Sequence, residues 1–210
     1  MARTLGTFIV LEGPDKSGKS TQAKRLAANL RADGLKVVHT REPGGTGFAE
    51  AIRKILLDPK HSVHPMAELF LYEAARAQHT QDVLFPALRK GAVVVCERYT
   101  LATLVYQGRG RGIPAPIVRQ MNRLATGGLA ADITLVLDIP ETEFSRRDVR
   151  RAHDRMEKEN ERFRRKVRGG YRALAKSEPR TYLLDSTEPM DRVEKEILQL
   201  VHGALRERSR

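Results

Sequence analysis

The fold of this chain is decided by residues 13–21, which read Gly13-Pro14-Asp15-Lys16-Ser17-Gly18-Lys19-Ser20-Thr21. This stretch fills every fixed position of the phosphate-binding loop pattern G-x-x-x-x-G-K-[ST]. The apolar, β-branched residues 7–11 before it predict a buried strand, and residues 22–30 after it predict a helix with Leu26 and Leu30 on one face. Strand, glycine loop and helix in this order form the structural context that the motif requires.

The loop predicts a binding site for the phosphates of a nucleoside triphosphate. Backbone N–H groups of such a loop point at phosphate oxygens, and the start of the following helix adds a partial positive charge. Lys19 would reach the β- and γ-phosphates, and the Ser20 hydroxyl would bind Mg²⁺. An ordinary glycine-rich turn with a chance lysine is the alternative, and the flanking strand and helix argue against it.

Composition limits the class of protein. The chain has 210 residues, 40% of them hydrophobic, which suffices for one α/β domain spanning residues 1–210. No run approaches the ~18 apolar residues of a membrane helix, and the N-terminus leads directly into the first strand, so we expect a cytoplasmic protein without a membrane partner. The single cysteine, Cys96, lies in an apolar run and is predicted to be a buried core residue.

The formal net charge of +12 favours anionic partners, and nucleic acid has to be considered beside nucleotides. Half of this charge lies in residues 143–172, where twelve basic residues accompany six acidic ones. A solvated helical face would account for many of these residues. It accounts poorly for the close cluster of Arg146, Arg147, Arg150 and Arg151.

Strand candidates alternate with helical segments along the chain. Strands are predicted at residues 7–11, 36–40, 92–97, 133–138 and 182–185. Helices are predicted at residues 18–33, 47–57, 63–90, 115–125, 142–153, 160–176 and 190–206, and a loop at 108–114. The alternation predicts an α/β fold, a three-layer α/β/α arrangement with a five-stranded parallel sheet, and a small basic helical lid at about residues 143–157.

Four further segments carry a resemblance to a known family. They are Thr-Arg-Glu-Pro-Gly-Gly-Thr at 40–46, Leu-Phe-Leu-Tyr-Glu-Ala-Ala-Arg-Ala-Gln-His at 69–79, Glu-Arg-Tyr at 97–99 and Asp-Arg-Met-Glu at 154–157. Together with the loop, and in this order, they resemble the thymidylate kinase family of P-loop nucleoside monophosphate kinases. The resemblance implies transfer of the γ-phosphate of ATP to dTMP with Mg²⁺, giving dTDP and ADP for dTTP synthesis. It also implies a homodimer, formed through the helices that flank Leu69 and Leu104.

The resemblance assigns the acceptor nucleotide to side chains from several segments. Tyr72 matches the aromatic position that stacks on thymine, and Arg76 the position that bonds a base carbonyl. Thr103 matches a position that bonds the pyrimidine edge, and Tyr106 a tyrosine that crowds the sugar 2′ position. Asp15 matches the acid that contacts the sugar 3′-hydroxyl. From the residues alone, core packing is the simpler interpretation of Tyr72, and helix capping is the alternative for Asp15.

Glu97 and Arg98 end the third predicted strand, at the edge where open α/β sheets place ligand chemistry. Glu97 can hold Mg²⁺ through water or orient the acceptor phosphate, and Arg98 can bind that phosphate with two nitrogens. A surface ion pair is the alternative. The family usually has aspartate at the position of Glu97 and serine at the position of Ala102.

The segment after the second predicted strand is expected to shape the acceptor site. Pro43 is a candidate for a cis proline in the turn that presents Arg41 and Glu42. Arg53, farther along the chain, is a candidate contact to the acceptor phosphate.

Phosphoryl transfer between two anions requires positive charge rather than covalent chemistry. Lys19 and the loop amides would hold the donor, and Arg98 the acceptor. An arginine of the lid, from Arg146, Arg150 or Arg151, would stabilise the transferred phosphoryl group.

Lys16 is a second source of that charge, and we expect the lid arginines to contribute more to stabilising the transferred phosphoryl group.

An acceptor that is already anionic needs no general base. In agreement with this, His79, His153 and His202 are predicted to be helical and to face solvent.

Two other functions remain open from the sequence. A deoxynucleoside kinase shares the loop and a Glu-Arg pair, but it would use Glu97 as a base for a neutral hydroxyl, and segment 41–45 counts against it. A nucleotide-dependent nucleic-acid-binding or switch protein would fit the charge. The chain has no Asn-Lys-x-Asp motif, and its aromatics are too scattered for a base-stacking platform, so no nucleic-acid partner is expected.

Overall fold

Parallel strands form the centre of the protein in the computed structural model, which describes residues 6–147 and 153–208. They are β1 (Phe8–Glu12), β2 (Val37–Arg41), β3 (Val93–Glu97), β4 (Ile133–Asp138) and β5 (Thr181–Asp185). The strand order is β2-β3-β1-β4-β5, and every neighbouring pair is parallel. All five predicted strands are confirmed, each to within one residue at either end.

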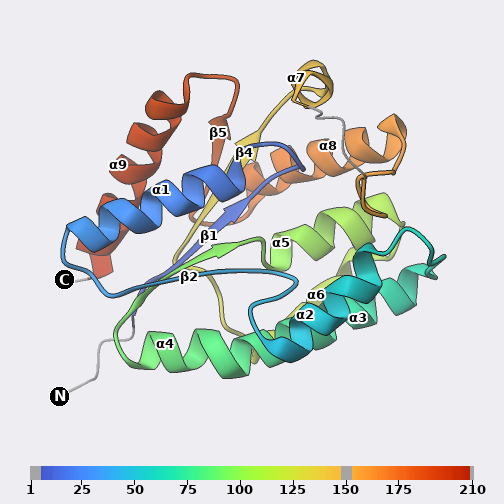
Figure 1. The fold of residues 1–210 in the computed structure, drawn as a ribbon, viewed down its shortest axis with the longest axis horizontal. Helices are drawn as coiled ribbons and strands as arrows, with labels where there is room; N and C mark the ends of the chain where they lie inside the picture. Colours follow the sequence, from blue (N-terminus) through green and yellow to red (C-terminus); the bar gives the residue numbers. More distant parts are fainter. Residues whose placement is uncertain (1–5, 148–152, 209–210) are drawn as a thin grey trace.

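Helices cover both faces of this sheet (Figure 1). On one face, α1 (Lys19–Ala32) and α9 (Met190–Arg208) pack through Leu26 and Ile197 onto Ile9 of β1. On the other face, α4 (Phe85–Arg89) and α8 (Glu161–Ser177) are among the helices that pack through apolar side chains onto the sheet. The other α-helices of the described residues are α2 (Gly47–Leu57), α3 (Pro65–His79), α5 (Thr100–Thr103), α6 (Ala115–Thr126) and α7 (Glu141–Arg146). The predicted three-layer α/β/α fold is confirmed.

The pairing of β1 with β3 places the phosphate loop. Leu11 of β1 lies opposite Glu97 of β3, and the N–H of Arg98 donates to Leu11 O at 2.8 Å. Both strands therefore end at the same edge of the sheet. The residues that follow them, Gly13 in one case and Arg98 in the other, are brought side by side although they are far apart in the sequence.

The predicted helix 63–90 is one helical path with a wide turn inside it. α3 passes into the π-helical segment η1 (Thr80–Leu84), and α4 follows directly. Pro86 in α4 has no N–H to donate, and its ring crowds the carbonyl of the preceding turn. The backbone therefore widens just before it.

The predicted loop 108–114 is wrong in its first half. α5 continues as a second π-helical segment, η2 (Leu104–Gly110). A Cβ on Gly110 would lie 2.5 Å from the ring of Phe163 in α8. This glycine therefore permits a close approach between two helices rather than a turn.

A buried carboxylate anchors the last residues of the predicted lid. Glu68 of α3 is fully buried and accepts hydrogen bonds from Arg155 Nη1 (2.5 Å), Arg111 Nη2 (3.0 Å) and Gln107 Nε2 (2.7 Å). Arg155 Nε also donates to Leu56 O in α2 at 2.7 Å. These bonds hold the chain around Arg155 against α2 and α3.

The helix predicted at 142–153 is shorter in the structure. Among the described residues of this stretch, only those of α7 are helical, and His153 lies outside any helix, contrary to the prediction. Residues 148–152, which include the predicted lid residues Arg150 and Arg151, lie outside the described residues.

Cys96 is fully buried in β3, as predicted. Burial raises the pKa of its thiol. None of the helices formed by residues 6–147 and 153–208 is long and apolar enough to cross a membrane.

Candidate active site

The phosphate loop turns tightly between β1 and α1. Lys16 and Gly18 have φ angles of 62° and 87°, in the left-handed region. At Gly13, with φ 134°, a Cβ would lie 2.3 Å from Leu137 O of β4, so only glycine allows the loop to pass so close to the neighbouring strand. Sheet packing therefore shapes the loop.

Lys19 begins α1 and points back into the loop. Its Nζ donates to Pro14 O at 2.6 Å and to Gly13 O at 3.1 Å, and the side chain is buried. Burial, and then the positive charge of Arg98, lower the pKa of Lys19 to about 7. An anion beside this ammonium group would favour its charged form.

Oxygen donors gather at the start of α1. The Ser20 hydroxyl donates to Glu97, and His39 Nε2 of β2 lies 2.9 Å from the other carboxylate oxygen of Glu97. Burial alone would raise the pKa of Glu97, but the hydrogen bonds from His39 and Ser20 outweigh it and lower that pKa. A hydroxyl and an ionised carboxylate are ligands that suit Mg²⁺, so the residues present fit this ion. His39 was not predicted from the sequence.

Arg98 lies between the loop and the helices behind it. Its φ is 67°, and Nη1 donates to Gly13 O at 3.0 Å and to the Tyr171 hydroxyl at 3.1 Å. Nη2 donates to Asp15 and to the Tyr106 hydroxyl, the latter at 3.2 Å. Tyr106 in turn donates to Asp15 at 3.1 Å. Three residues predicted from separate segments therefore meet at one guanidinium group.

Two cavities meet at this point. An open cleft of about 490 Å³ runs along the loop and Ser20, and a smaller pocket of about 70 Å³ lies behind it. The two cavities share four lining residues: Asp15, Arg53, Arg98 and Asp154. The smaller pocket is also lined by Pro43, Leu57, Tyr72, Ala102, Thr103, Tyr106, Gln107 and Met156. Most residues predicted for the acceptor thus surround one pocket. Asp154 and Met156, from the quoted segment 154–157 but with no predicted role, complete it together with Leu57 and Gln107, which no motif indicated.

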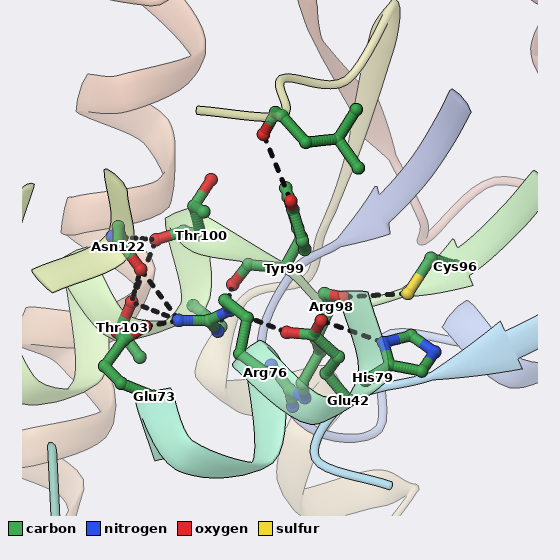
Figure 2. Close-up of polar contacts among 12 residues, drawn as sticks. Glu42, Glu73, Arg76, His79, Cys96, Arg98, Tyr99, Thr100, Thr103 and Asn122 are labelled. Carbon is green, nitrogen blue, oxygen red and sulfur yellow. Dashed lines mark hydrogen bonds and ion pairs between the residues drawn. The ribbon is translucent and has the colours of Figure 1, made fainter. Parts of the chain in front are cut away.

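Arg76 does not lie with the other residues that were predicted to contact the base. It is buried and does not line the pocket, and its nitrogens donate to Glu42 (2.7 Å), Glu73 (2.8 Å), Asn122 (2.7 Å), Thr103 (3.2 Å) and Tyr99 O (2.9 Å). Figure 2 shows its guanidinium group between Glu42 on one side and Thr103 and Asn122 on the other. Its contact with the base stays a prediction.

The turn after β2 is held by a buried histidine. The Glu42–Pro43 peptide bond is cis, as the sequence suggested. His79 Nδ1 lies 3.0 Å from Glu42, and its Nε2 lies 2.7 Å from the Thr40 hydroxyl. The prediction that His79 faces solvent is wrong, because this turn packs over the end of α3 and buries the ring completely. His202 is helical and pairs with Asp33 at 3.1 Å, with its side chain 41% exposed.

Two arginines that were predicted to bind ligand lie near this turn. Arg53 Nη1 donates to Pro43 O at 2.9 Å and lines both cavities. Arg41 lines only the cleft, is half-exposed and pairs with Glu50 at 3.3 Å.

Two neighbouring arginines of the basic cluster, Arg146 and Arg147, lie in different surroundings at the end of α7. Arg146 is exposed and pairs with Glu143 at 2.9 Å, outside the lining of the cleft. The next residue, Arg147, lines the cleft and donates to Lys16 O at 3.3 Å and to Ser186 O at 2.6 Å. The Lys16 ammonium group lies 4.1 Å from the centre of the Phe144 ring in α7. The structure therefore brings Arg147, and not Arg146, to the loop.

A phosphate loop that opens into a cleft, with a second pocket joined to it through an arginine, defines the class: P-loop enzymes that move a phosphoryl group between two bound substrates. A sequence profile described as thymidylate kinase matches residues 11–197. The chain belongs to the thymidylate kinase family.

Individual relatives agree with this assignment. A thymidylate kinase of Deinococcus radiodurans is 46% identical over 194 residues, which cover 91% of this chain and 94% of the relative. One of Pseudomonas putida (strain W619) is 47% identical over 201 residues, covering 94% and 97%. The crystal structure of thymidylate kinase from Ehrlichia chaffeensis matches with a TM-score of 0.75 at 31% identity, covering 94% of this chain and 98% of that chain.

We expect ATP binding at about pH 8 to take up roughly one proton. A pKa of about 7 leaves most Lys19 side chains neutral at that pH, and a triphosphate raises this pKa by favouring the ammonium form. ATP affinity should therefore fall as the pH rises above about 7. Isothermal titration in buffers of different ionisation enthalpy measures the uptake. Lys19→Met is the control, and equal uptake by both proteins would contradict this assignment.

Proposed function

We propose that the protein transfers the γ-phosphate of ATP to dTMP, giving dTDP and ADP, and so supplies dTTP synthesis. The supporting observation is the pocket behind the phosphate loop, which opens into the cleft at Arg98 and Asp15. An oxygen of the acceptor phosphate attacks the γ-phosphorus, and the bond to the oxygen that bridges the β- and γ-phosphates breaks. The electron pair leaves with ADP, and the new bond completes dTDP.

The phosphate loop is the proposed binding site for ATP, the phosphate donor. Residues 13–21 would bind the ATP phosphates, with Lys19 beside the β- and γ-phosphates. Ser20 and Glu97 would hold Mg²⁺, which neutralises phosphate charge when bound. Since the donor and the acceptor are both anionic, the main task of these residues is to hold the two substrates in line.

The smaller pocket is the proposed binding site for dTMP, the phosphate acceptor. Arg98 would bind the acceptor phosphate, together with Arg53, and Asp15 the sugar 3′-hydroxyl. Tyr72 would stack on the thymine, and Tyr106 would exclude a 2′-hydroxyl. Further proposed contacts come from Arg41, Glu42, Pro43, Arg76 and Thr103.

A nucleoside acceptor fits the pocket less well than a nucleoside monophosphate. A thymidine kinase would need Glu97 as the base for a neutral 5′-hydroxyl. In the structure Glu97 is bonded to Ser20 and His39 in the cleft and is not among the residues that line the pocket. Two guanidinium groups, those of Arg53 and Arg98, line it instead and favour an anionic acceptor.

ADP release measured across nucleoside acceptors tests this function. We expect dTMP to be the preferred acceptor over dUMP, dCMP and dGMP, and thymidine to give no turnover. Faster turnover of thymidine than of dTMP would contradict the proposal. Salt-sensitive binding of random oligonucleotides without kinase activity would favour the nucleic-acid alternative instead.

We further propose that the lid of residues 143–157 supplies the transition-state charge, with Arg150 and Arg151 more important than Lys16 or Arg146. An Arg150→Ala, Arg151→Ala double variant should lower kcat by ~10³, the scale of a lost arginine finger. Lys16→Ala should lower it less. Arg165→Ala removes an exposed arginine of α8 that pairs with Glu161, and serves as the control. Unchanged turnover in the double variant would exclude this role.

A homodimer is proposed through the layer of α2, α3 and α6. Leu69 and Leu104 themselves are buried within the chain. Among the described residues, five of the nine exposed large apolar side chains lie on this layer: Phe48, Ile55, Phe70, Ile117 and Leu124. An apolar surface of this kind favours association.

Sedimentation velocity tests the dimer. The wild type should sediment as a dimer and Phe70→Asp as a monomer, because a charge would be buried at the interface. Leu35→Asp places the same charge on an exposed side chain outside this layer and should remain dimeric. A wild-type monomer would contradict the proposal.

A cytoplasmic location stays a prediction that fluorescence microscopy of a tagged chain can test.

A further inference from the structure

A tyrosine outside both cavities contacts the arginine that joins them. Tyr171 of α8 is fully buried, and it lines neither the cleft nor the pocket. Its hydroxyl accepts a hydrogen bond from Arg98 Nη1 at 3.1 Å and donates one to Glu12 Oε2 at 2.8 Å. The hydroxyl is therefore polarised between a guanidinium group and a carboxylate, which strengthens both bonds.

Glu12 is a rigid end to this chain of bonds. It is the last residue of β1 and is fully buried. Its Oε1 accepts hydrogen bonds from the backbone N–H of Tyr99 (2.7 Å) and of Ala102 (3.1 Å), at the start of α5. Burial raises the pKa of Glu12 despite the opposing effect of Arg98. Backbone bonds thus fix the carboxylate, and the Tyr171 hydroxyl connects it to Arg98.

The two ends of the Arg98 guanidinium group face different surroundings. Nη1 is held by Gly13 O and Tyr171, neither of which lines the pocket. Nη2 faces Asp15 and Tyr106, both of which line it. One nitrogen is therefore anchored to the protein framework, while the other is directed toward the acceptor.

We propose that Tyr171 is a positioning residue for the acceptor: its hydroxyl, held by Glu12, fixes Nη1 of Arg98 so that the rest of the guanidinium group faces the acceptor phosphate. The inference rests on the proposed transfer to dTMP. Through Arg98 and Glu12, Tyr171 also connects α8, the helix that follows the lid, to the phosphate loop and to β1. An arginine has four rotatable bonds, and restricting them before the substrate arrives lowers the cost of binding.

Packing alone is the competing role for Tyr171. Its ring lies against Tyr106, with ring centres 6.3 Å apart, and belongs to a buried apolar cluster. A phenylalanine keeps this ring and removes only the hydroxyl. Tyr171→Phe therefore separates the two roles.

The first test compares the steady-state constants of Tyr171→Phe with those of the wild type. We expect kcat/KM for dTMP to fall about tenfold, the scale of one hydrogen bond to a charged group, mainly through KM. KM for ATP should change less than twofold, because Lys19 and the loop amides remain in place. Glu12→Gln leaves one oxygen to accept from the backbone N–H groups of Tyr99 and Ala102, and it turns an NH₂ group, which cannot accept a hydrogen bond, toward the Tyr171 hydroxyl. It should therefore raise KM for dTMP in the same selective way.

Tyr182→Phe is the control. It also deletes one tyrosine hydroxyl, but from a side chain of β5 that is 42% exposed and lines neither cavity. Its kinetic constants should match those of the wild type. Thermal unfolding of all variants shows whether the loss of kcat/KM for dTMP in Tyr171→Phe is caused by a less stable fold.

Calorimetric binding of dTMP tests whether Tyr171 acts through Arg98. In an Arg98→Lys background, which lacks Nη1, adding Tyr171→Phe should weaken dTMP binding by less than twofold. An equal loss in both backgrounds, equal losses for ATP and dTMP, or a Tyr171→Phe enzyme within twofold of the wild type would each overturn the inference. In the last case a wild type that phosphorylates dTMP leaves the proposed function standing, whereas a wild type that cannot phosphorylate dTMP contradicts that function.

Discussion

The parallel pairing of β1 with β3 is the constraint on which the site depends. Because Leu11 lies opposite Glu97, the two chain segments that leave these strands emerge at one edge of the sheet. One becomes the phosphate loop and the other carries Arg98. Their contact at Gly13 O and Asp15 lies where the cleft along the loop meets the smaller pocket. A shift of one residue in this register would turn the side chains of the strand to the opposite face and separate the two.

Buried charge is the main physical cost of this arrangement. Lys19 and Arg98 lie close enough that Arg98 lowers the pKa of Lys19. The structure offsets the charge of Arg98 with Asp15 and, through Tyr171, with Glu12. An isolated buried charge would be strongly unfavourable, so these partners stabilise the folded chain. Residues of the site thus also stabilise the fold around it.

The strands and the loop could be predicted because their signals are local. A short apolar run that is rich in β-branched residues and bounded by turn residues indicates a buried strand, and the loop pattern carries its own mechanism. The π-helical turns at η1 and η2 could not be predicted in this way. The first lies just before Pro86, and the second ends at Gly110, where the absence of a Cβ leaves room for the Phe163 ring of a distant helix. The burial of His79 likewise depends on a turn that packs over α3 from another part of the chain.

The sequence by itself determined the fold class, the phosphate loop, the resemblance to one family and most of the residues that line the smaller pocket. Only the tertiary structure decided which side chains hold those residues in place. His39 behind Glu97, Tyr171 behind Arg98 and Arg147 beside the loop come from elements that no motif connects. The physical reason is that a hydrogen bond depends on distance in space, which the packing of helices on the sheet sets and the spacing of residues along the chain does not.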